Sequence, residues 1–141
     1  MNQAATIDYP SYSSARTHFR QVLDATGSGR SVTVARDGQV SVVVPADRLR
    51  HFFFHSVPPR VELSREDGRV IALMAGRPFV SEGADVADAL ADLVGTLREY
   101  AEDWEARLQH APNHHDNWGL VQLIKLSSDE EILEWFEHGG E

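Results

Sequence analysis

The 141-residue chain contains no cysteine, which excludes disulfide bonds and thiol catalysis and suits the reducing cytoplasm. No apolar run is long enough to span a membrane. The opening residues Met1–Gln3 form neither a basic nor an apolar segment, so we expect no secretory signal peptide. Internal repeats and low-complexity tracts are also lacking. Together with a hydrophobic content of 42%, these absences favour a folded cytoplasmic protein.

Charge is distributed unevenly along the chain, whose net charge is −9. Residues 1–60 hold seven Arg and four Asp, a net charge of +3, whereas residues 61–141 hold six basic and eighteen acidic residues, a net charge of −12. A basic segment can bind the phosphates of nucleic acid, and an acidic segment attracts a basic protein. The asymmetry favours two binding functions on one chain, with charge that serves only solubility as the alternative.

Residues 1–55 are predicted to form a small unit in which a strand, a helix, a hairpin and a second helix follow one another. A unit of this size buries little apolar surface, so we expect a symmetric dimer to cover what remains exposed. The expected elements are a strand at Thr6–Asp8, one helix from Pro10-Ser11 to Gly27-Ser28-Gly29, a hairpin around Asp37-Gly38, and a helix from Pro45.

Residues 56–60 contain Val57-Pro58-Pro59 and are predicted to form a linker. An acidic α+β domain is expected over residues 61–141. Its predicted elements are a hairpin around Glu66-Asp67-Gly68, a strand at Pro78–Ser81, a long helix from the Asp85 cap to Leu108, a loop at Pro112–Asn117, a strand at Gly119–Leu126, and a short terminal helix after Ser127 or Ser128, each of which has a Glu three residues on.

Four residues of the first unit are candidates for DNA binding. Arg16 follows the hydroxyl residues Ser13 and Ser14 in the first turns of the first helix, and Arg36 directly precedes the hairpin turn. Hydroxyls and an arginine near a helix N-terminus suit phosphate, and arginine can also contact guanine edges in a bidentate manner. Solvated surface arginines are the alternative interpretation.

The stretch Ser11–Arg16, the hairpin segment Gly29–Gly38 and the strand Val42–Pro45 resemble the Phd/YefM antitoxin family over about residues 5–55. The resemblance implies a homodimer, open to further association, that binds operator DNA through Arg16 and Arg36 and represses its own operon. Two departures stand out. His18-Phe19 replaces the usual Asn-Leu, and Asp37 replaces a basic hairpin residue, which would weaken DNA affinity or shift its register.

The stretches Glu66–Ala72 and Pro78–Leu90 resemble a HicB-type antitoxin domain, built from a β-hairpin and a helix, over about residues 61–108. The chain departs from that pattern at Gly76-Arg77-Pro78, where the family has a Pro-Gly-Cys turn. The resemblance implies an enzymatically inert domain that docks a protein. An α+β extension that only completes the fold is the alternative.

The terminal helix is the predicted toxin-binding element, because it combines acidic residues with Ile132, Leu133, Trp135 and Phe136. Tryptophan and phenylalanine are enriched at binding hot spots, and an amphipathic acidic helix in a basic groove is a common mode of recognition. An equally weighted alternative is that Trp135 and Phe136 pack within the chain, on the segment 119–126.

Catalytic, metal and cofactor sites are not predicted. His110, His114, His115 and Asp116 lack a recognised metal-ligand spacing and favour a solvated loop. Asp85, Asp88 and Asp92 could form a carboxylate site, but their spacing is more typical of the acidic start and exposed face of a helix.

The preferred hypothesis is therefore an antitoxin that binds operator DNA and a cognate toxin. By association with Phd/YefM proteins, the toxin would be a small basic ribonuclease of the RelE/ParE type, with a HicA-type ribonuclease as the second choice. A stand-alone transcriptional repressor, whose C-terminal domain senses a ligand or mediates oligomerisation, is the rival hypothesis. An enzyme that uses the His/Asp loop comes third.

Overall fold

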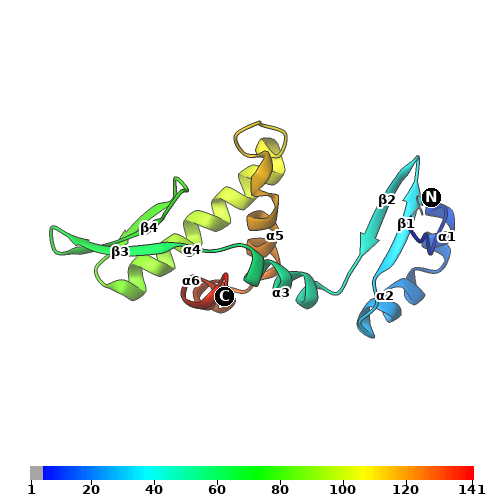
Figure 1. Cartoon of the computed structure of the whole chain (residues 1–141), viewed down its shortest axis with the longest axis horizontal. Coiled ribbons are helices and arrows are strands. Elements are labelled where there is room, and N and C mark those ends of the chain that lie inside the picture. Colours follow the sequence, from blue (N-terminus) through cyan, green and yellow to red (C-terminus); the bar gives the residue numbers. More distant parts are fainter. Residues whose placement is uncertain (1–4) are drawn as a thin grey trace. The chain divides into compact units, whose positions relative to one another are not determined.

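The computed structural model describes residues 5–141, and the chain divides into two compact units, Met1–Leu49 and Arg50–Glu141 (Figure 1). Each unit combines helices with one antiparallel sheet, so the expected α+β class is confirmed. The division falls after Leu49, within helix α3 (Ala46–Ser56), and not after residue 55 as the sequence suggested. Among residues 5–141, no helix is long and apolar enough to cross a membrane.

Two short helices precede the hairpin of the first unit, α1 (Tyr12–Thr17) and α2 (Phe19–Gly27). The prediction of one continuous helix is wrong, because the backbone leaves helical geometry at His18, with φ −112° and ψ 26°. The imidazole Nδ1 of His18 lies 2.8 Å from the carbonyl oxygen of Ser14, and its ring stacks on Tyr9. These side-chain contacts hold His18 at the break.

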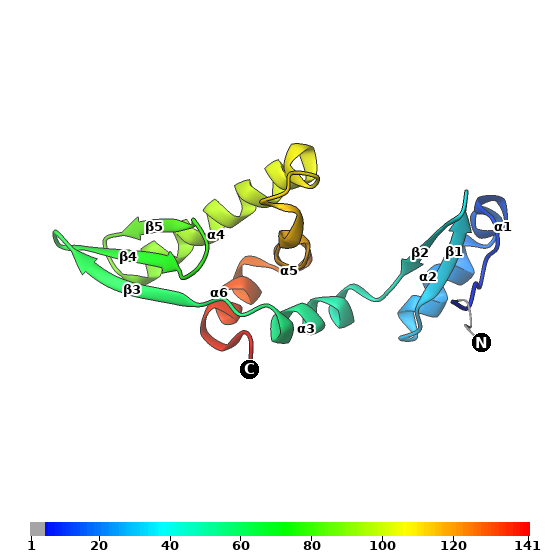
Figure 2. The ribbon, with the colours of Figure 1, turned by 45° about the horizontal axis from the view of Figure 1, so that its top comes forward.

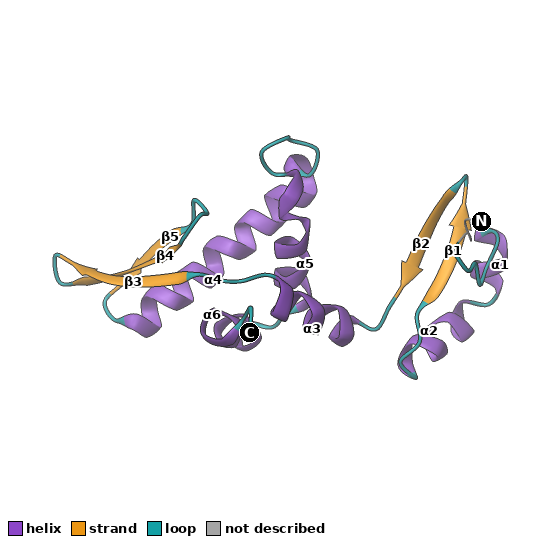
Figure 3. Cartoon of the chain, viewed as in Figure 1, coloured by secondary structure: helices purple, strands orange, loops and turns teal. Residues whose placement is uncertain are grey.

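The hairpin of the first unit pairs β1 (Val32–Arg36) with β2 (Gln39–Val43) around Asp37-Gly38 (Figure 3). Both turn residues have positive φ, 50° and 79°, as a tight two-residue turn requires. The strand expected at Thr6–Asp8 does not form. Asp8 instead exchanges hydrogen bonds with Thr33: its carboxylate accepts from the Thr33 backbone N–H at 2.9 Å, and its own N–H donates to the Thr33 hydroxyl. Backbone pairing is limited to the next residue, Tyr9, which forms a single parallel bridge with Val34 of β1.

The core of the first unit is small, centred on Val22, Ala25 and Val32. Alternation along the strands turns Val40 and Val42 to the opposite face of the hairpin, where Val42 is 55% exposed. The first unit therefore leaves apolar surface uncovered on its sheet, and the exposed large apolar residues of its helices are Tyr12, Phe19 and Leu23.

The second unit places a three-stranded sheet, ordered β3-β4-β5, against the long helix α4 (Figure 2). Helix α4 packs on β4 and β5, and Val70, Ala72 and Met74 of β4 are buried beneath it. The elements after α3 are β3 (Val61–Glu66), β4 (Arg69–Met74), β5 (Val80–Gly83), α4 (Val86–Asp103), a π-helical turn (Trp104–Leu108), a 3-10 turn (His115–Asn117), α5 (Trp118–Leu126) and α6 (Asp129–His138).

The segment Gly119–Leu126 was expected to be a strand, and this prediction is wrong because it lies in helix α5. Its apolar residues Leu120, Val121, Leu123 and Ile124 are all buried. A short run that is apolar on every side fits a buried helix as well as a buried strand, so its periodicity could not discriminate between the two.

The segment 56–60 packs as part of the second unit and is not a free linker. The carbonyl of Val57 accepts a hydrogen bond of 2.8 Å from the indole N–H of Trp135, and the carbonyl of Pro58 accepts one of 2.9 Å from Arg77 Nη1. Because proline lacks an N–H but keeps its carbonyl, Pro58 can follow the end of α3 and still be anchored by Arg77.

Arg98 joins α4 to the turn between α5 and α6. Its guanidinium donates to the carbonyl oxygens of Ile124 (2.6 Å) and Ser127 (2.8 Å) and to the carboxylate of Asp129 (2.8 Å). Carbonyls at a helix C-terminus lack helical partners, so this side chain supplies donors that the backbone cannot. Arg98 thereby positions α6 on the rest of the unit.

Candidate functional site

The start of α1 is capped by Ser11, whose hydroxyl accepts from the backbone N–H of Ser14 at 3.1 Å. Among residues 5–141, the hydroxyls of Ser13 and Ser14 make no hydrogen bond; Ser13 is exposed and Ser14 is half-buried. The predicted pair of hydroxyls thus lies just inside the helix start, next to Ser11, where the sequence had expected the helix to begin. Ser13 is the better placed of the two to meet an external group.

Arg36 is brought to the start of α1 by the hairpin. Its guanidinium carbon lies 5.6 Å from the centroid of the Tyr12 ring, a cation–π geometry. Arg16 follows Tyr12 by four residues, so both side chains share one face of α1, and Arg16 is exposed. The structure therefore places Arg36 over Tyr12, which is 58% exposed, and Arg16 one turn further along the same face of α1. The sequence did not single out Tyr12 as part of this surface.

Asp37 modifies the charge of this surface. Its carboxylate lies 3.6 Å from Arg36 Nε, and both side chains are exposed. Counted over the observed unit Met1–Leu49, the chain has five Arg against four Asp, a net charge of +1, because Arg50 and Arg60 belong to the second unit. The positive charge of the first unit is therefore local to particular arginines and does not extend over the unit.

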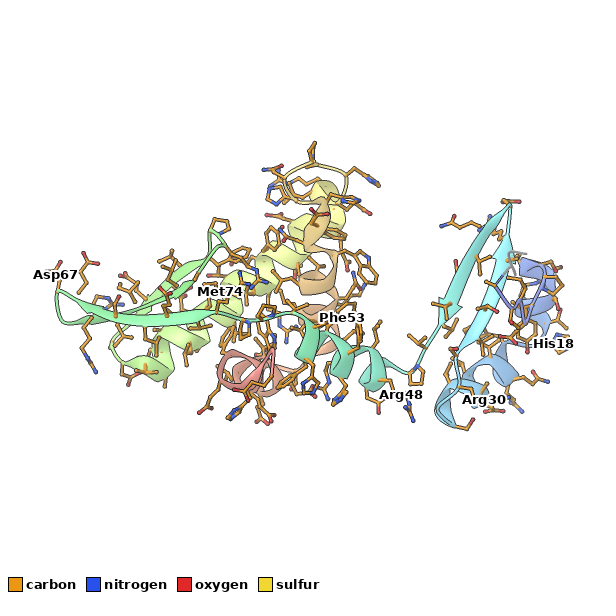
Figure 4. The ribbon with its side chains drawn as sticks, viewed as in Figure 1. His18, Arg30, Arg48, Phe53, Asp67 and Met74 are labelled. Atoms are coloured by element: carbon orange, nitrogen blue, oxygen red, sulfur yellow. The ribbon has the colours of Figure 1, made fainter. Side chains whose placement is uncertain are left out.

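The predicted toxin-binding residues of α6 divide between core and surface. Ile132 and Trp135 are fully buried and Phe136 nearly so, whereas Leu133 is 37% exposed. Trp135 and Phe136 are buried within the second unit, as are Phe53 of α3 and Met74 of β4 (labelled in Figure 4). Helix α6 packs mainly on α4, and Trp135 bonds the carbonyl of Val57, whereas the alternative had expected segment 119–126 as the packing surface. Leu133 is the member of the predicted set that remains accessible.

Helix α6 begins with a capping box, in which Ser128 and Glu131 bond each other's backbone N–H groups. The N–H of Ser128 donates to Glu131 Oε1 at 2.9 Å, and this bond, aided by Arg50 at 2.9 Å, lowers the pKa of Glu131 against a smaller opposing effect of burial. Asp129 is held by Arg98. The first-turn acids Asp129 and Glu131 therefore stabilise the fold itself.

A groove of about 600 Å³ lies between the start of α4 and the outer face of α6. Val86 of α4 and Leu133 of α6 are the large exposed apolar side chains that line it, with the smaller Ala87, and the polar lining consists of Glu134, Glu137 and His138. Glu137 follows Leu133 by four residues and Glu134 by three, so its side chain lies between theirs on the exposed side of α6. The groove therefore combines apolar contact surface with two carboxylates.

A second hollow, of about 510 Å³, is lined by Phe53, Trp104, Trp118 and the loop residues His110 and His115. His114 is held apart from it: its Nδ1 lies 2.9 Å from the hydroxyl of Tyr100, and its carbonyl accepts from the indole of Trp104. Within residues 5–141, no group of three or more His, Asp or Glu side chains is arranged to hold a metal ion. His110 and His115 therefore share the hollow, and His114 is held outside it.

The structure thus defines a small α+β protein with one basic and one acidic candidate binding surface. No protein-family model and no curated protein sequence matches the chain. A solved structure from Syntrophomonas wolfei subsp. wolfei, described as the antitoxin part of a proposed toxin/antitoxin system, is similar to it with a TM-score of 0.75. The similarity covers 94% of this chain and 96% of the other at 22% sequence identity, so the two proteins share a fold.

Proposed function

We propose that this chain is a non-enzymatic antitoxin that acts in the cytoplasm, where it binds operator DNA through its first unit and a toxin through its second. The observation that carries the proposal is the fold shared with the Syntrophomonas antitoxin over nearly the full length of both chains. The separate basic and acidic surfaces support it, because DNA and a basic ribonuclease would need surfaces of opposite charge.

The DNA-binding part of the proposal rests on Arg16 and Arg36 around Tyr12, with the Ser13 hydroxyl beside them and Ser14 as a weaker candidate. The sequence resemblance to Phd/YefM proteins over residues 5–55 supports the same surface. A homodimer would bury the exposed apolar residues of the hairpin and helices, such as Val42 and Phe19, and would present two copies of the arginines to a palindromic operator.

Binding of the chain to the DNA upstream of its own operon tests this part. Arg16→Ala should weaken binding and lower the slope of log K against log salt by roughly one, because one phosphate contact is lost. The control is Arg20→Ala, which removes the same charge from an exposed position of α2 in the same unit. Equal effects of the two substitutions would mean that general charge, and not this surface, holds the DNA.

The toxin-binding part is tested by expressing the chain together with the short basic protein that the proposal expects to be encoded beside it. Expression of that protein alone should arrest growth, and co-expression of the full chain should restore it. The sequence resemblances suggest a RelE/ParE-type ribonuclease first and a HicA-type ribonuclease second. Absence of any toxic neighbour would overturn the antitoxin proposal in favour of a stand-alone repressor.

The aromatic hollow favours that second candidate function, a repressor whose C-terminal unit senses a ligand. Trp104 and Trp118 line it together with Phe53, and such walls suit a planar organic molecule. Because the three tryptophans all lie in the second unit, a ligand seated there should change tryptophan fluorescence. DNA affinity that changes with such a ligand, in a strain without a toxic neighbouring gene, would establish the repressor.

A further inference from the structure

We propose that the groove between the start of α4 and the outer face of α6 is the docking site for a basic amphipathic helix of the partner toxin. This inference rests on the proposed antitoxin function and names the surface that performs it. It also relocates toxin binding on α6, from the buried side that carries Trp135 to the exposed side that carries Leu133, Glu134 and Glu137.

The first argument is that only some of the acidic side chains of α6 are paired with basic groups of the chain itself. Asp129 is paired with Arg98, and Glu131 closes the capping box and pairs with Arg50. Glu130 and Glu134 form no ion pair within residues 5–141, and Glu137 faces only the neighbouring His138, at 3.8 Å. The fold therefore pairs Asp129 and Glu131, which flank the buried face of α6, and leaves the acids of the outer face without strong cationic partners.

The second argument is the spacing of those remaining acids. Glu130 and Glu134 are four residues apart, and Glu134 and Glu137 are three apart, so all three share one helix face. Like charges at these spacings repel one another and weaken a helix. If a partner helix bound along this face, its arginine or lysine side chains would offset the repulsion between these carboxylates.

The third argument is that the acids border an apolar surface. Val86 and Leu133 are 40% and 37% exposed, and Leu90 and Ala87 complete the apolar lining. An acidic surface alone would attract any cation, whereas an apolar strip between two helices selects a partner with apolar residues at i, i+3, i+4 and i+7. A helix of about ten residues, roughly 15 Å long, would match the length of α6.

The charge of the second unit supports the same occupant. Residues Arg50–Glu141 carry eight basic and eighteen acidic side chains, a net charge of −10, which disfavours a second copy of this unit in the groove and attracts a basic protein. The free edge of β3 is a less suitable site, because its exposed side chains mix Glu62 and Glu66 with Arg65.

The test measures the affinity of the full chain for the basic protein encoded beside it, by titration calorimetry at low and at physiological salt. The double substitution Glu134→Gln/Glu137→Gln should weaken binding roughly fivefold at low salt and reduce its salt dependence. Leu133→Ser should weaken it roughly tenfold or more at both salt concentrations, because an apolar anchor is removed. Tryptophan fluorescence and circular dichroism confirm that each variant is folded.

The matched control is Glu99→Gln/Glu102→Gln, which removes two exposed acids at the same spacing from α4, away from the groove. Its affinity should stay within about twofold of the wild type, since long-range charge contributes little at physiological salt. Equal affinities of the groove variants and the control would overturn the groove while the antitoxin function stands. Failure of the wild-type chain to bind the neighbouring protein would overturn the antitoxin function, and the groove with it.

A second copy of this chain is the other occupant that the experiment distinguishes. If the groove substitutions dissociate the chain's own oligomer in light scattering and leave toxin affinity unchanged, the groove is a self-association surface and the proposal is wrong. If they weaken toxin binding and leave the oligomer intact, the proposal holds.

Discussion

Gly83 ends β5 where the strand passes directly over the first turn of α4, and its replacement by alanine should destabilise the second unit. A Cβ atom at this position would lie 2.4 Å from the backbone nitrogen of Ala89 and 2.6 Å from the carbonyl carbon and Cβ of Asp88. These atoms belong to the helix, which is held by the Asp85 cap and by the packing of Leu93 and Leu97. Strand and helix would therefore have to separate.

Overpacking of a well-packed site costs about 1–3 kcal/mol, and we expect the upper part of that range because the clashing atoms are backbone. For a unit of this size, each kcal/mol corresponds to roughly 4–8 °C in Tm, so Gly83→Ala should lower Tm by about 10 °C or more. Gly95, in the middle of the same helix, is the matched control: a Cβ there meets nothing within 4 Å. Gly95→Ala should raise stability by about 0.5–1 kcal/mol, because alanine has the higher helix propensity.

The assay is thermal or urea unfolding followed by tryptophan fluorescence. All three tryptophans lie in the second unit, and Trp104 and Trp135 are buried, so the signal reports that unit. Opposite shifts for the two glycine substitutions are expected. An unchanged midpoint for Gly83→Ala would refute the close approach of β5 to α4, and a loss of stability for Gly95→Ala would show that α4 is covered where the structure leaves it open.

Further substitutions test the basic surface and the position of α6. Asp37→Asn should strengthen operator binding several-fold at low salt, because it removes the carboxylate beside Arg36. Asparagine tolerates the positive φ of the turn, so the hairpin should be retained. Gel-shift titration measures the affinity, and an unchanged value would remove Arg36 from the interface. Arg98→Met should lower the free energy of unfolding by about 2 kcal/mol, because the carbonyls of Ile124 and Ser127 lose charged donors at a partly exposed site. A loss below about 0.5 kcal/mol in urea unfolding would contradict that role. The pKa of Glu131 is lowered in the folded state, so its carboxylate stabilises the fold at any pH above 4.5, the ordinary pKa of the group. That contribution is lost as the pH falls through the folded-state pKa. The stability difference between wild type and Glu131→Gln should therefore shrink below about pH 4.5 in fluorescence-monitored unfolding, and a pH-independent difference would exclude this linkage.

Features that depend on a few adjacent residues could be predicted from the sequence. The Asp-Gly pairs at 37–38 and 67–68 form the expected turns, each with positive φ at both residues, because few other dipeptides adopt that geometry at low cost. Asp85 caps α4 as expected, and of the two serines proposed for the terminal capping box the structure selects Ser128. Turns and caps are set by local sterics and hydrogen bonds, so no distant residue is needed to specify them.

Burial and proximity, in contrast, were decided by the tertiary structure. The apolar run at 119–126 became a helix, and Trp135 became a core residue bonded to the carbonyl of Val57, 78 positions away. At the basic surface, the sequence supplied Arg16 and Arg36 as candidates, but only the fold placed Arg36 over Tyr12. At the acidic surface, three of the four residues that the sequence proposed for toxin binding lie on a face of α6 that is buried. The amphipathic pattern specifies two faces of a helix, and which face meets a partner depends on the neighbours that cover the other.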